Sequence, residues 1–226
     1  MLKECNAHGY FRAEYCPACG SQAKFLLSDE EVNMLGRTLA GVLRHFPERY
    51  GLEMDNHGWV DLRAFIDAVQ VRNRRFRFLR PHHVTGLIET DPKGRYEARE
   101  GKVRATYAHS VDVELDLPTE DIPETLYYPT AEEGWKAIQE AGIKPTDRKR
   151  VHLSGTFAAA MEAGKVRIPS PAILEINAKG AREKGRTIFK AGKTVYLTDE
   201  MPPEFIRRME EEEYPAEAPP LENEPE

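Results

Sequence analysis

The sequence predicts an α+β protein made of a short N-terminal zinc knuckle and two lobes. Three observations support this fold class. Cysteines and a histidine gather within residues 1–27, helical spacing followed by strand alternation fills residues 28–118, and short strands alternate with short helices over residues 119–208. Glutamate and proline dominate residues 209–226, which we expect to form a disordered acidic tail. A chain of 226 residues is long enough for two hydrophobic cores.

The knuckle is predicted from four residues in the pattern C-x2-H-x7-C-x2-C, namely Cys5, His8, Cys16 and Cys19. Zinc prefers four thiolate or imidazole ligands in a tetrahedron, and pairs two residues apart reach it through tight turns. A catalytic zinc keeps one position open, so four protein ligands indicate a closed, structural site. A chance grouping of small buried thiols is the alternative.

The second segment begins with a capping box, in which Ser28 precedes a helix and Glu31 follows three residues later. Apolar spacing extends this helix to about residue 44. A short strand at residues 58–60, a helix capped by Asp61 and a third helix at residues 82–89 come next. Strand alternation at 95–99 and 102–107 around Glu100-Gly101 predicts a hairpin. Three helices followed by a hairpin is the order of a winged helix, which binds nucleic acids or proteins.

The last structured segment follows an acidic linker between Pro118 and Pro123, where we place a domain boundary. We expect a compact, split sheet with short helices, since no element is long. The expected strands are 125–128, 151–153, 172–176, 187–190 and 194–197, and the expected helices are 131–141, 157–163 and 178–184. Neither a G-x-G-x-x-G turn nor a Walker A loop is present, which argues against Rossmann and P-loop nucleotide binding.

Charge is distributed unevenly along the chain. The formal net charge is −6, but eight glutamates lie in residues 209–226, and the remainder has 32 basic and 30 acidic residues. Residues 71–104 hold ten basic and four acidic side chains, a candidate surface for a polyanion. An ordinary solvated face is the alternative explanation.

Composition also bears on the location of the protein. Charged residues make up 31% of the chain, and no apolar run approaches the roughly 18 residues that a membrane helix needs. The N-terminus lacks a basic patch followed by an apolar stretch, so we expect no secretory signal, no membrane partner and a cytoplasmic location. We also expect a monomer.

Arginine and histidine recur in short motifs that are far apart in the sequence. Singly, each has a structural explanation, such as an arginine that complements a helix dipole. The motifs are Leu43-Arg44-His45, Arg104-Ala105 with His109-Ser110, Arg148, and Val151-His152-Leu153-Ser154.

Together these motifs resemble the RNA 2′-phosphotransferases, which remove the 2′-phosphate left at a tRNA splice junction. The zinc knuckle is similar to that of archaeal members. The resemblance spans about residues 30–206, in family order. Further matching segments are Phe46-Pro47, Gly51-Leu52, Gly58-Trp59-Val60, Gly142-Ile143-Lys144-Pro145, Val195-Tyr196-Leu197-Thr198-Asp199 and Met201-Pro202-Pro203.

The sequence departs from the family at three places. The family motif L-Y-H-G-T is Leu126-Tyr127-Tyr128-Pro129-Thr130 here, so the histidine and glycine that approach the nicotinamide side of NAD are replaced. Ala108 stands where the family has glycine in R-A-x-x-G-H-S, and Arg150 replaces the first histidine of R-x-H-V-H.

The resemblance implies an ADP-ribosyltransferase-like C-terminal lobe and a reaction with NAD as co-substrate. The RNA 2′-phosphate attacks C1″ of the nicotinamide ribose, nicotinamide leaves, and O2″ then attacks phosphorus, which gives RNA 2′-OH and ADP-ribose 1″,2″-cyclic phosphate. The substrate is 2′-phosphorylated, tRNA-like RNA.

The resemblance also assigns roles to residues, and we expect them to meet in a cleft between the two lobes. Arginine forks suit a phosphate through bidentate pairing. The reacting-phosphate residues are Arg44, His45, Arg104 and Arg148, those near NAD are His152, Ser154, Thr130 and Tyr128, and those that bind RNA are His109 and Ser110.

Two other functions stay open from the sequence. A zinc and winged-helix protein could bind RNA without chemistry, with salt-dependent affinity and no nicotinamide release. An ADP-ribosyltransferase could use the same residues on a terminal nucleic-acid phosphate and stop after the first step, and the Tyr128-Pro129 replacement is compatible with this.

Overall fold

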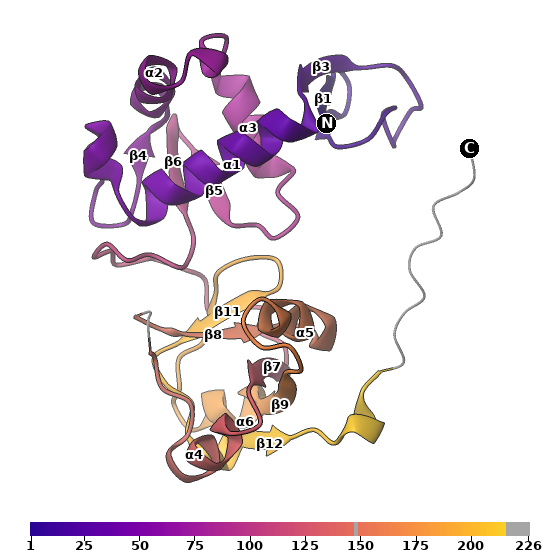
Figure 1. Ribbon diagram of the computed structural model, residues 1–226, viewed down its shortest axis with the longest axis vertical. Helices are drawn as coiled ribbons and strands as arrows, with labels where there is room; N and C mark the ends of the chain where they lie inside the picture. The colour runs from indigo at the N-terminus through magenta and orange to yellow at the C-terminus, as the bar shows by residue number, and fades with distance from the viewer. Residues whose placement is uncertain (147–148, 216–226) are drawn as a thin grey trace. The chain divides into compact units, whose positions relative to one another are not determined.

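The computed structural model describes residues 1–146 and 149–215, which form a mixed α/β protein with several sheets (Figure 1). The chain divides into two compact units. The first contains Met1–Pro118 with the short segment Lys190–Lys193, and the second contains Thr119–Thr146, Arg150–Phe189 and the described residues from Thr194 onward. Within the described part of the chain, no helix has the length and apolar character needed to cross a membrane.

The first unit begins with a small antiparallel sheet that the sequence analysis did not assign. Its strands are β1 (Leu2–Cys5), β2 (Gly9–Phe11) and β3 (Lys24–Leu27), in the order β2-β1-β3. Leu2 pairs with Leu27 and both are fully buried, so the sheet has an apolar side. Helix α3 (Pro81–Glu89) packs against β1 and β2, and helix α1 (Asp29–Arg44) packs against β3.

Helix α1 (Asp29–Arg44) begins as predicted. The Glu31 N–H donates to Ser28 Oγ at 3.2 Å, and the Ser28 N–H donates to the Glu31 carboxylate at 2.9 Å, so the capping box is complete. The helix buries one apolar stripe, which follows the spacing seen in the sequence. These residues are Val32, Leu35, Leu39, Val42 and Leu43.

Two further helices and a second sheet complete the first unit. Helix α2 (Leu62–Arg72) is capped by Asp61, whose carboxylate accepts from the Ala64 N–H at 2.7 Å, and α3 spans Pro81–Glu89. The sheet has the order β4-β6-β5, with strands β4 (Val60–Asp61), β5 (Tyr96–Arg99) and β6 (Lys102–Ala105).

The predicted hairpin is confirmed, although both strands are shorter than expected. Glu100 and Gly101 have φ values of 51° and 75°, the left-handed pair that a tight two-residue hairpin turn requires. Thr106 and Tyr107 leave the strand and begin an irregular segment that extends to residue 124. Of the strand predicted at residues 58–60, Val60 alone lies in β4, because the Gly58 N–H closes the preceding turn by donating to the Asp55 carbonyl at 2.9 Å.

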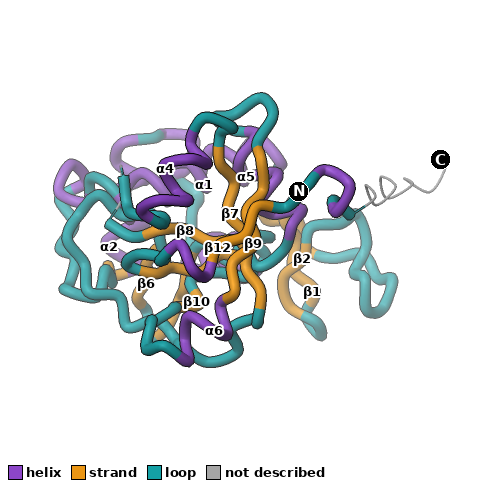
Figure 2. The backbone as a smooth tube through the Cα atoms, turned by 90° about the horizontal axis from the view of Figure 1, so that it is seen from below, coloured by secondary structure: helices purple, strands orange, loops and turns teal. Residues whose placement is uncertain are grey.

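The second unit is a six-stranded sheet with helices on both faces, and its strands from β11 to β12 pair in antiparallel fashion (Figure 2). Helices α4 and α6 share one apolar cluster with Leu126 and Leu153, whereas α5 packs against Tyr127 on the other face. The order is β10-β11-β8-β7-β9-β12. The elements are β7 (Thr125–Thr130), α4 (Gly134–Ala141), β8 (Val151–Ser154), α5 (Phe157–Lys165), β9 (Ala172–Asn177), α6 (Ala178–Glu183), β10 (Phe189–Lys190), β11 (Val195–Thr198) and β12 (Ile206–Arg208).

The sheet is almost divided between β7 and β8. Tyr127 pairs with Ser154 there, and this is the one registered pair between these strands in the described chain. By contrast, β7 pairs with β9 along its whole length, from Thr125 to Thr130. The two halves therefore separate beyond the Tyr127–Ser154 pair.

Residues 209–215 differ from the disordered tail that composition predicted. Met209 is 7% exposed, and the Tyr214 hydroxyl accepts a hydrogen bond from the Ile173 N–H at 3.2 Å. Glu213 accepts two hydrogen bonds from Arg207. One apolar and one aromatic side chain anchor this acidic segment, an effect that composition alone does not reveal. The rest of the predicted tail, residues 216–226, lies outside the described residues.

Candidate functional site

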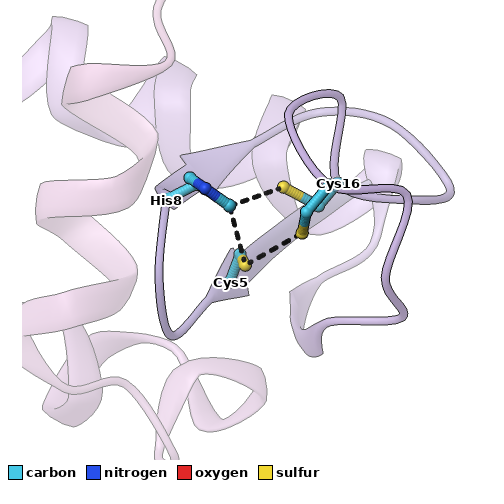
Figure 3. A group of neighbouring side chains, drawn as sticks. Cys5, His8 and Cys16 are labelled. Carbon is cyan, nitrogen blue, oxygen red and sulfur yellow. Dashed lines mark hydrogen bonds between the residues drawn. The ribbon is translucent and has the colours of Figure 1, made fainter.

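The predicted metal ligands lie together in the first unit. Their sulfur and nitrogen atoms are all within 4.8 Å of one another. His8 Nδ1 is 3.6 Å from the Sγ atoms of Cys5 and Cys16, and Figure 3 shows these three side chains pointing toward one another. The sulfurs of Cys5 and Cys19 are 3.9 Å apart. Zinc bonds of about 2.3 Å to sulfur and 2.0 Å to nitrogen at tetrahedral angles give ligand separations of about 3.5–3.8 Å. The four residues therefore fit zinc.

Local structure explains why these ligands converge. Cys5 ends β1, and the turn to β2 carries His8, whose N–H donates to the Cys5 carbonyl at 3.3 Å. Cys16 and Cys19 lie on a second turn, in which the Gly20 N–H donates to the Cys16 carbonyl at 2.8 Å. Hydrogen bonds from Ser21 lower the pKa of the Cys19 thiol to about 6. That favours the thiolate, which is the form that binds metal.

A second cluster lies where α1 ends and contains four of the predicted site residues. The Ser110 N–H donates to the Arg44 carbonyl at 2.9 Å, and a hydrogen bond of 3.0 Å joins Ser110 Oγ to His45 Nδ1. The irregular segment after β6 thus closes over the helix end. It brings His109 and Ser110 beside Arg44 and His45.

Arg44 presents a cation that the fold does not neutralise. Its guanidinium carbon is 4.8 Å from the ring centre of Tyr107 and 5.8 Å from that of Tyr96. Its Nε and Nη2 atoms are buried, and no acceptor within the described residues bonds to them. Buried donors normally have partners, so this side chain is poised to meet an anion.

His109 is buried beside these cations. Burial, with the charges of Arg44, His45 and Arg104, lowers the pKa of His109 to about 4. The imidazole is therefore neutral near pH 7. Its Nε2 atom has no hydrogen-bond partner among the residues that the structure describes.

Arg104 is more constrained than the sequence indicated. It is 4% exposed, and its Nε donates to Glu97 at 2.7 Å. Its Nη1 donates to the His57 carbonyl at 3.2 Å and to the Asp116 carboxylate. The guanidinium also lies 4.4 Å from the centre of the Trp59 ring. A phosphate would have to displace one of these two carboxylates or use the remaining Nη2 donors.

The NAD-side residues lie on the two central strands of the second unit but on different faces. Ser154 pairs with Tyr127, and His152 shares its face of β8, which is the face covered by α5. Tyr128 and Thr130 lie on the opposite face of β7, because their positions alternate with Tyr127. A single face of this sheet does not present all four, and Arg148 lies outside the described residues.

Three residues around the cluster were not identified from sequence. Tyr96 and Tyr107 flank the Arg44 guanidinium, and Asp116 binds Arg104. Tyr96 lies in the basic stretch at residues 71–104, and Tyr107 ends the predicted hairpin, so the sequence offered a signal for the two tyrosines. Asp116 gave none, because it lies in an irregular segment whose course the sequence pattern does not specify.

The fold and the two clusters define a class: an α/β protein with a Cys3His group that could hold a metal ion and with arginine and histidine side chains gathered at the end of α1. The profile of the "RNA 2′-phosphotransferase, Tpt1 / KptA family" matches residues 29–200. The chain therefore belongs to the RNA 2′-phosphotransferase family.

Individual relatives agree with this membership. The chain is 40% identical over 207 residues to a "Probable RNA 2′-phosphotransferase" of Thermoplasma volcanium. The aligned residues make up 91% of this chain and 88% of that protein. It is 40% identical to "Probable RNA 2′-phosphotransferase 1" of Archaeoglobus fulgidus, over 92% of this chain and 94% of that protein. A Methanosarcina acetivorans protein with the same name as the first is 38% identical over 93% of this chain and its whole length.

Proposed function

We propose that this protein removes an internal 2′-phosphate from RNA and uses NAD as the acceptor of the phosphate. The observation that carries the proposal is the end of α1, where Arg44 holds two buried, unsatisfied donors beside the His45–Ser110 hydrogen bond. Family membership supports the RNA 2′-phosphate as substrate.

The chemistry proceeds in two balanced steps. A phosphate oxygen attacks C1″ of NAD, and the bond to nicotinamide breaks. The O2″ hydroxyl then gives up its proton and attacks phosphorus, while the RNA 2′-oxygen leaves and takes a proton. A phosphate monoester is already anionic at pH 7, so the first step needs orientation rather than a strong base.

The residues of the first unit suit these needs. Arg44 would bind the phosphate oxygens, and its position between two tyrosine rings fixes the guanidinium before substrate arrives. His45, oriented by Ser110, would transfer a proton in the second step. Arg104 and Arg148 complete the proposed phosphate cluster, and His109 and Ser110 would lie beside the RNA.

The lobes take matching roles in this proposal. Helices α1–α3 followed by the β5–β6 hairpin form a winged-helix lobe for RNA. The nearly divided sheet of the second unit forms an ADP-ribosyltransferase-like lobe for NAD, with His152, Ser154, Tyr128 and Thr130 as contacts. The zinc centre would hold the N-terminal sheet together and take no part in the reaction.

A second candidate function rests on Pro129. Proline has no N–H, so the backbone donor that a glycine would offer to the carboxamide is missing at this position. NAD bound less firmly on that side could still give up ADP-ribose to a terminal phosphate of DNA or RNA. The reaction would then stop at an adduct.

One mass-spectrometric experiment tests these assignments. The protein is mixed with NAD and an oligoribonucleotide that carries one internal 2′-phosphate. Loss of the phosphate from the RNA, with nicotinamide and ADP-ribose cyclic phosphate as products, is the expected result. A stable ADP-ribose adduct would favour the second candidate, and unchanged RNA would contradict both. Arg148→Ala should abolish the reaction in a folded protein.

A further inference from the structure

A basic cavity lies in the first unit beside the middle of α1, and its lining residue Arg95 contacts the Tyr96 ring, which also lies near Arg44. It has a volume of about 230 Å³ and opens between α1, α3 and the segments that follow β2 and precede β5. Its lining combines three arginines with apolar side chains. The lining residues are Arg12, Val32, Asn33, Gly36, Arg37, Ala40, Leu87 and Arg95.

Two of the three arginines are fixed by bonds to the fold. Arg12 Nε donates to Thr90 Oγ1 at 2.9 Å, and its Nη2 donates to the Leu87 carbonyl at 3.2 Å. Arg95 donates through Nε and Nη2 to Asp91, with a shortest distance of 2.6 Å. Neither Nη1 atom has an acceptor within the described chain. Each guanidinium is therefore held in place through Nε and Nη2, and its Nη1–H donors can bind a ligand.

The charge of the lining is positive even after its internal ion pair is counted. Asp91 is fully buried and neutralises one of the three guanidinium groups. Arg37 is exposed and makes no ion pair with any described residue. Two positive charges remain around one cavity, and guanidinium groups bind phosphate oxygens through paired N–H donors.

Gly36 indicates that the cavity is kept open. It lies inside α1, where glycine costs roughly 1 kcal/mol relative to alanine. A Cβ atom there would meet no heavy atom within 4 Å, so neighbouring side chains do not require glycine. Because Gly36 lines the cavity, the methyl group of an alanine would take space inside it.

We propose that this cavity binds a phosphate group of the RNA strand at a nucleotide other than the one that carries the reacting 2′-phosphate. The inference rests on the proposed function in that it takes RNA as the ligand. Arg12, Arg37 and Arg95 hold the phosphate, and the apolar side chains of Val32, Ala40 and Leu87 accommodate the adjoining sugar. Since Arg12 directly follows β2, the sheet that adjoins the predicted metal ligands contributes a residue to RNA binding.

The test measures binding of a fluorescein-labelled single-stranded RNA without a 2′-phosphate to the zinc-loaded full chain, in the absence of NAD. Arg37→Ala should weaken affinity about fivefold and lower the slope of log affinity against log salt by about 0.7, one phosphate contact. Arg63→Ala is the matched control, because Arg63 is exposed on α2 and pairs with Asp67. It should change neither quantity.

Gly36→Ala separates binding from folding. The substitution should raise the melting temperature, because alanine favours the helix, and should weaken RNA binding, because the methyl group enters the cavity. A raised melting temperature with unchanged RNA affinity would overturn the proposal. So would an Arg37→Ala protein that binds RNA as the Arg63→Ala control does.

Two further measurements define what the cavity binds. Adenosine 5′-monophosphate and inorganic phosphate are titrated into the wild-type and Arg37→Ala proteins. Weak binding of both, with RNA affinity dependent on Arg37, supports the assignment to the strand. Tight nucleotide binding that requires Arg37, with RNA affinity independent of it, would overturn it in favour of a free nucleotide. Because no turnover is measured, failure of the proposed reaction would leave this result interpretable.

Discussion

His45 Nδ1 lies 3.0 Å from Ser110 Oγ, although 65 residues separate the two in the sequence. The Ser110 hydroxyl also lies 3.4 Å from the Arg44 carbonyl, to which it donates. A hydroxyl that donates to this carbonyl leaves its oxygen to accept from the Nδ1–H of His45. One serine thus connects the end of α1 to the histidine ring and orients it, as a second residue does in many acid–base pairs.

Ser110→Ala should therefore lower kcat for dephosphorylation about tenfold, since a correctly oriented acid or base contributes at least that much. KM for RNA should change less, because Arg44 keeps its position. Steady-state assays of the purified variant measure both constants, and circular dichroism checks the fold. Ser110→Thr retains the hydroxyl and should recover most of the rate. Equal rates for the alanine variant and the wild-type protein would remove Ser110 from the mechanism.

His109 should make stability depend on pH in acid. Burial, with the charges of Arg44, His45 and Arg104, lowers the pKa of His109 from 6.5 to about 4 in the folded chain. As pH falls through this window the unfolded chain takes up a proton that the folded chain does not. The free energy of unfolding should fall by on the order of 3 kcal/mol between pH 6.5 and 4.

Urea unfolding at several pH values, with zinc bound, measures this loss. His109→Gln cannot titrate in this range, so its stability should decline less steeply than that of the wild-type protein. The difference between the two proteins isolates His109 from the carboxylates that also titrate in acid. If the free energy of unfolding falls equally with pH in both proteins, His109 is not the source of the loss of stability.

Elements with local signals were predictable from the sequence. The capping box of Ser28 and Glu31 begins α1, and the Glu100-Gly101 pair turns the hairpin, because both act over a few residues. The strands β1, β2 and β3 were missed, since each is four residues or shorter and forms through pairing rather than propensity. Helix α4 begins at Gly134 instead of residue 131 for a related reason, as Ala131–Gly134 form a turn.

For the site, too, residues in short motifs were predictable from the sequence, whereas contacts between residues far apart in the sequence were not. The arginine and histidine motifs marked Arg44 and His45, and the metal spacing marked Cys5 and its partners. The sequence did not reveal that Arg104 is bound by Glu97 and Asp116. Those contacts depend on the path of residues 106–118, which have no regular structure and therefore no periodicity to read.

Ala108 should be stabilised by replacement with glycine. Its φ is 65°, a left-handed conformation that costs a residue with a Cβ roughly 1–2 kcal/mol. Glycine removes that strain and loses part of the gain to the greater entropy of the unfolded chain, so Ala108→Gly should raise the melting temperature by about 1–3 °C. Calorimetry measures the change.

Ala98→Gly is the control for the preceding substitution. Ala98 is exposed on β5 and has ordinary strand geometry, so glycine there should lower the melting temperature. If both variants lose stability to the same extent, the left-handed conformation at residue 108 does not carry strain.

Loss of one metal ligand should separate folding from chemistry. Cys16 is 2% exposed and its Sγ lies 3.6 Å from His8 Nδ1, so Cys16→Ser should abolish stoichiometric zinc binding. Metal analysis should fall from one zinc per chain to well below one, and the melting temperature should drop, because β1–β3 lose the ion that ties their turns together. The folded protein should keep measurable dephosphorylation, since Arg44 and His45 lie outside the β1–β3 sheet that adjoins the predicted metal ligands. Weaker RNA binding is expected through Arg12, which the loosened sheet would no longer hold against α3. A folded, zinc-free protein with no turnover even at saturating RNA would instead show that the metal has a role beyond structure.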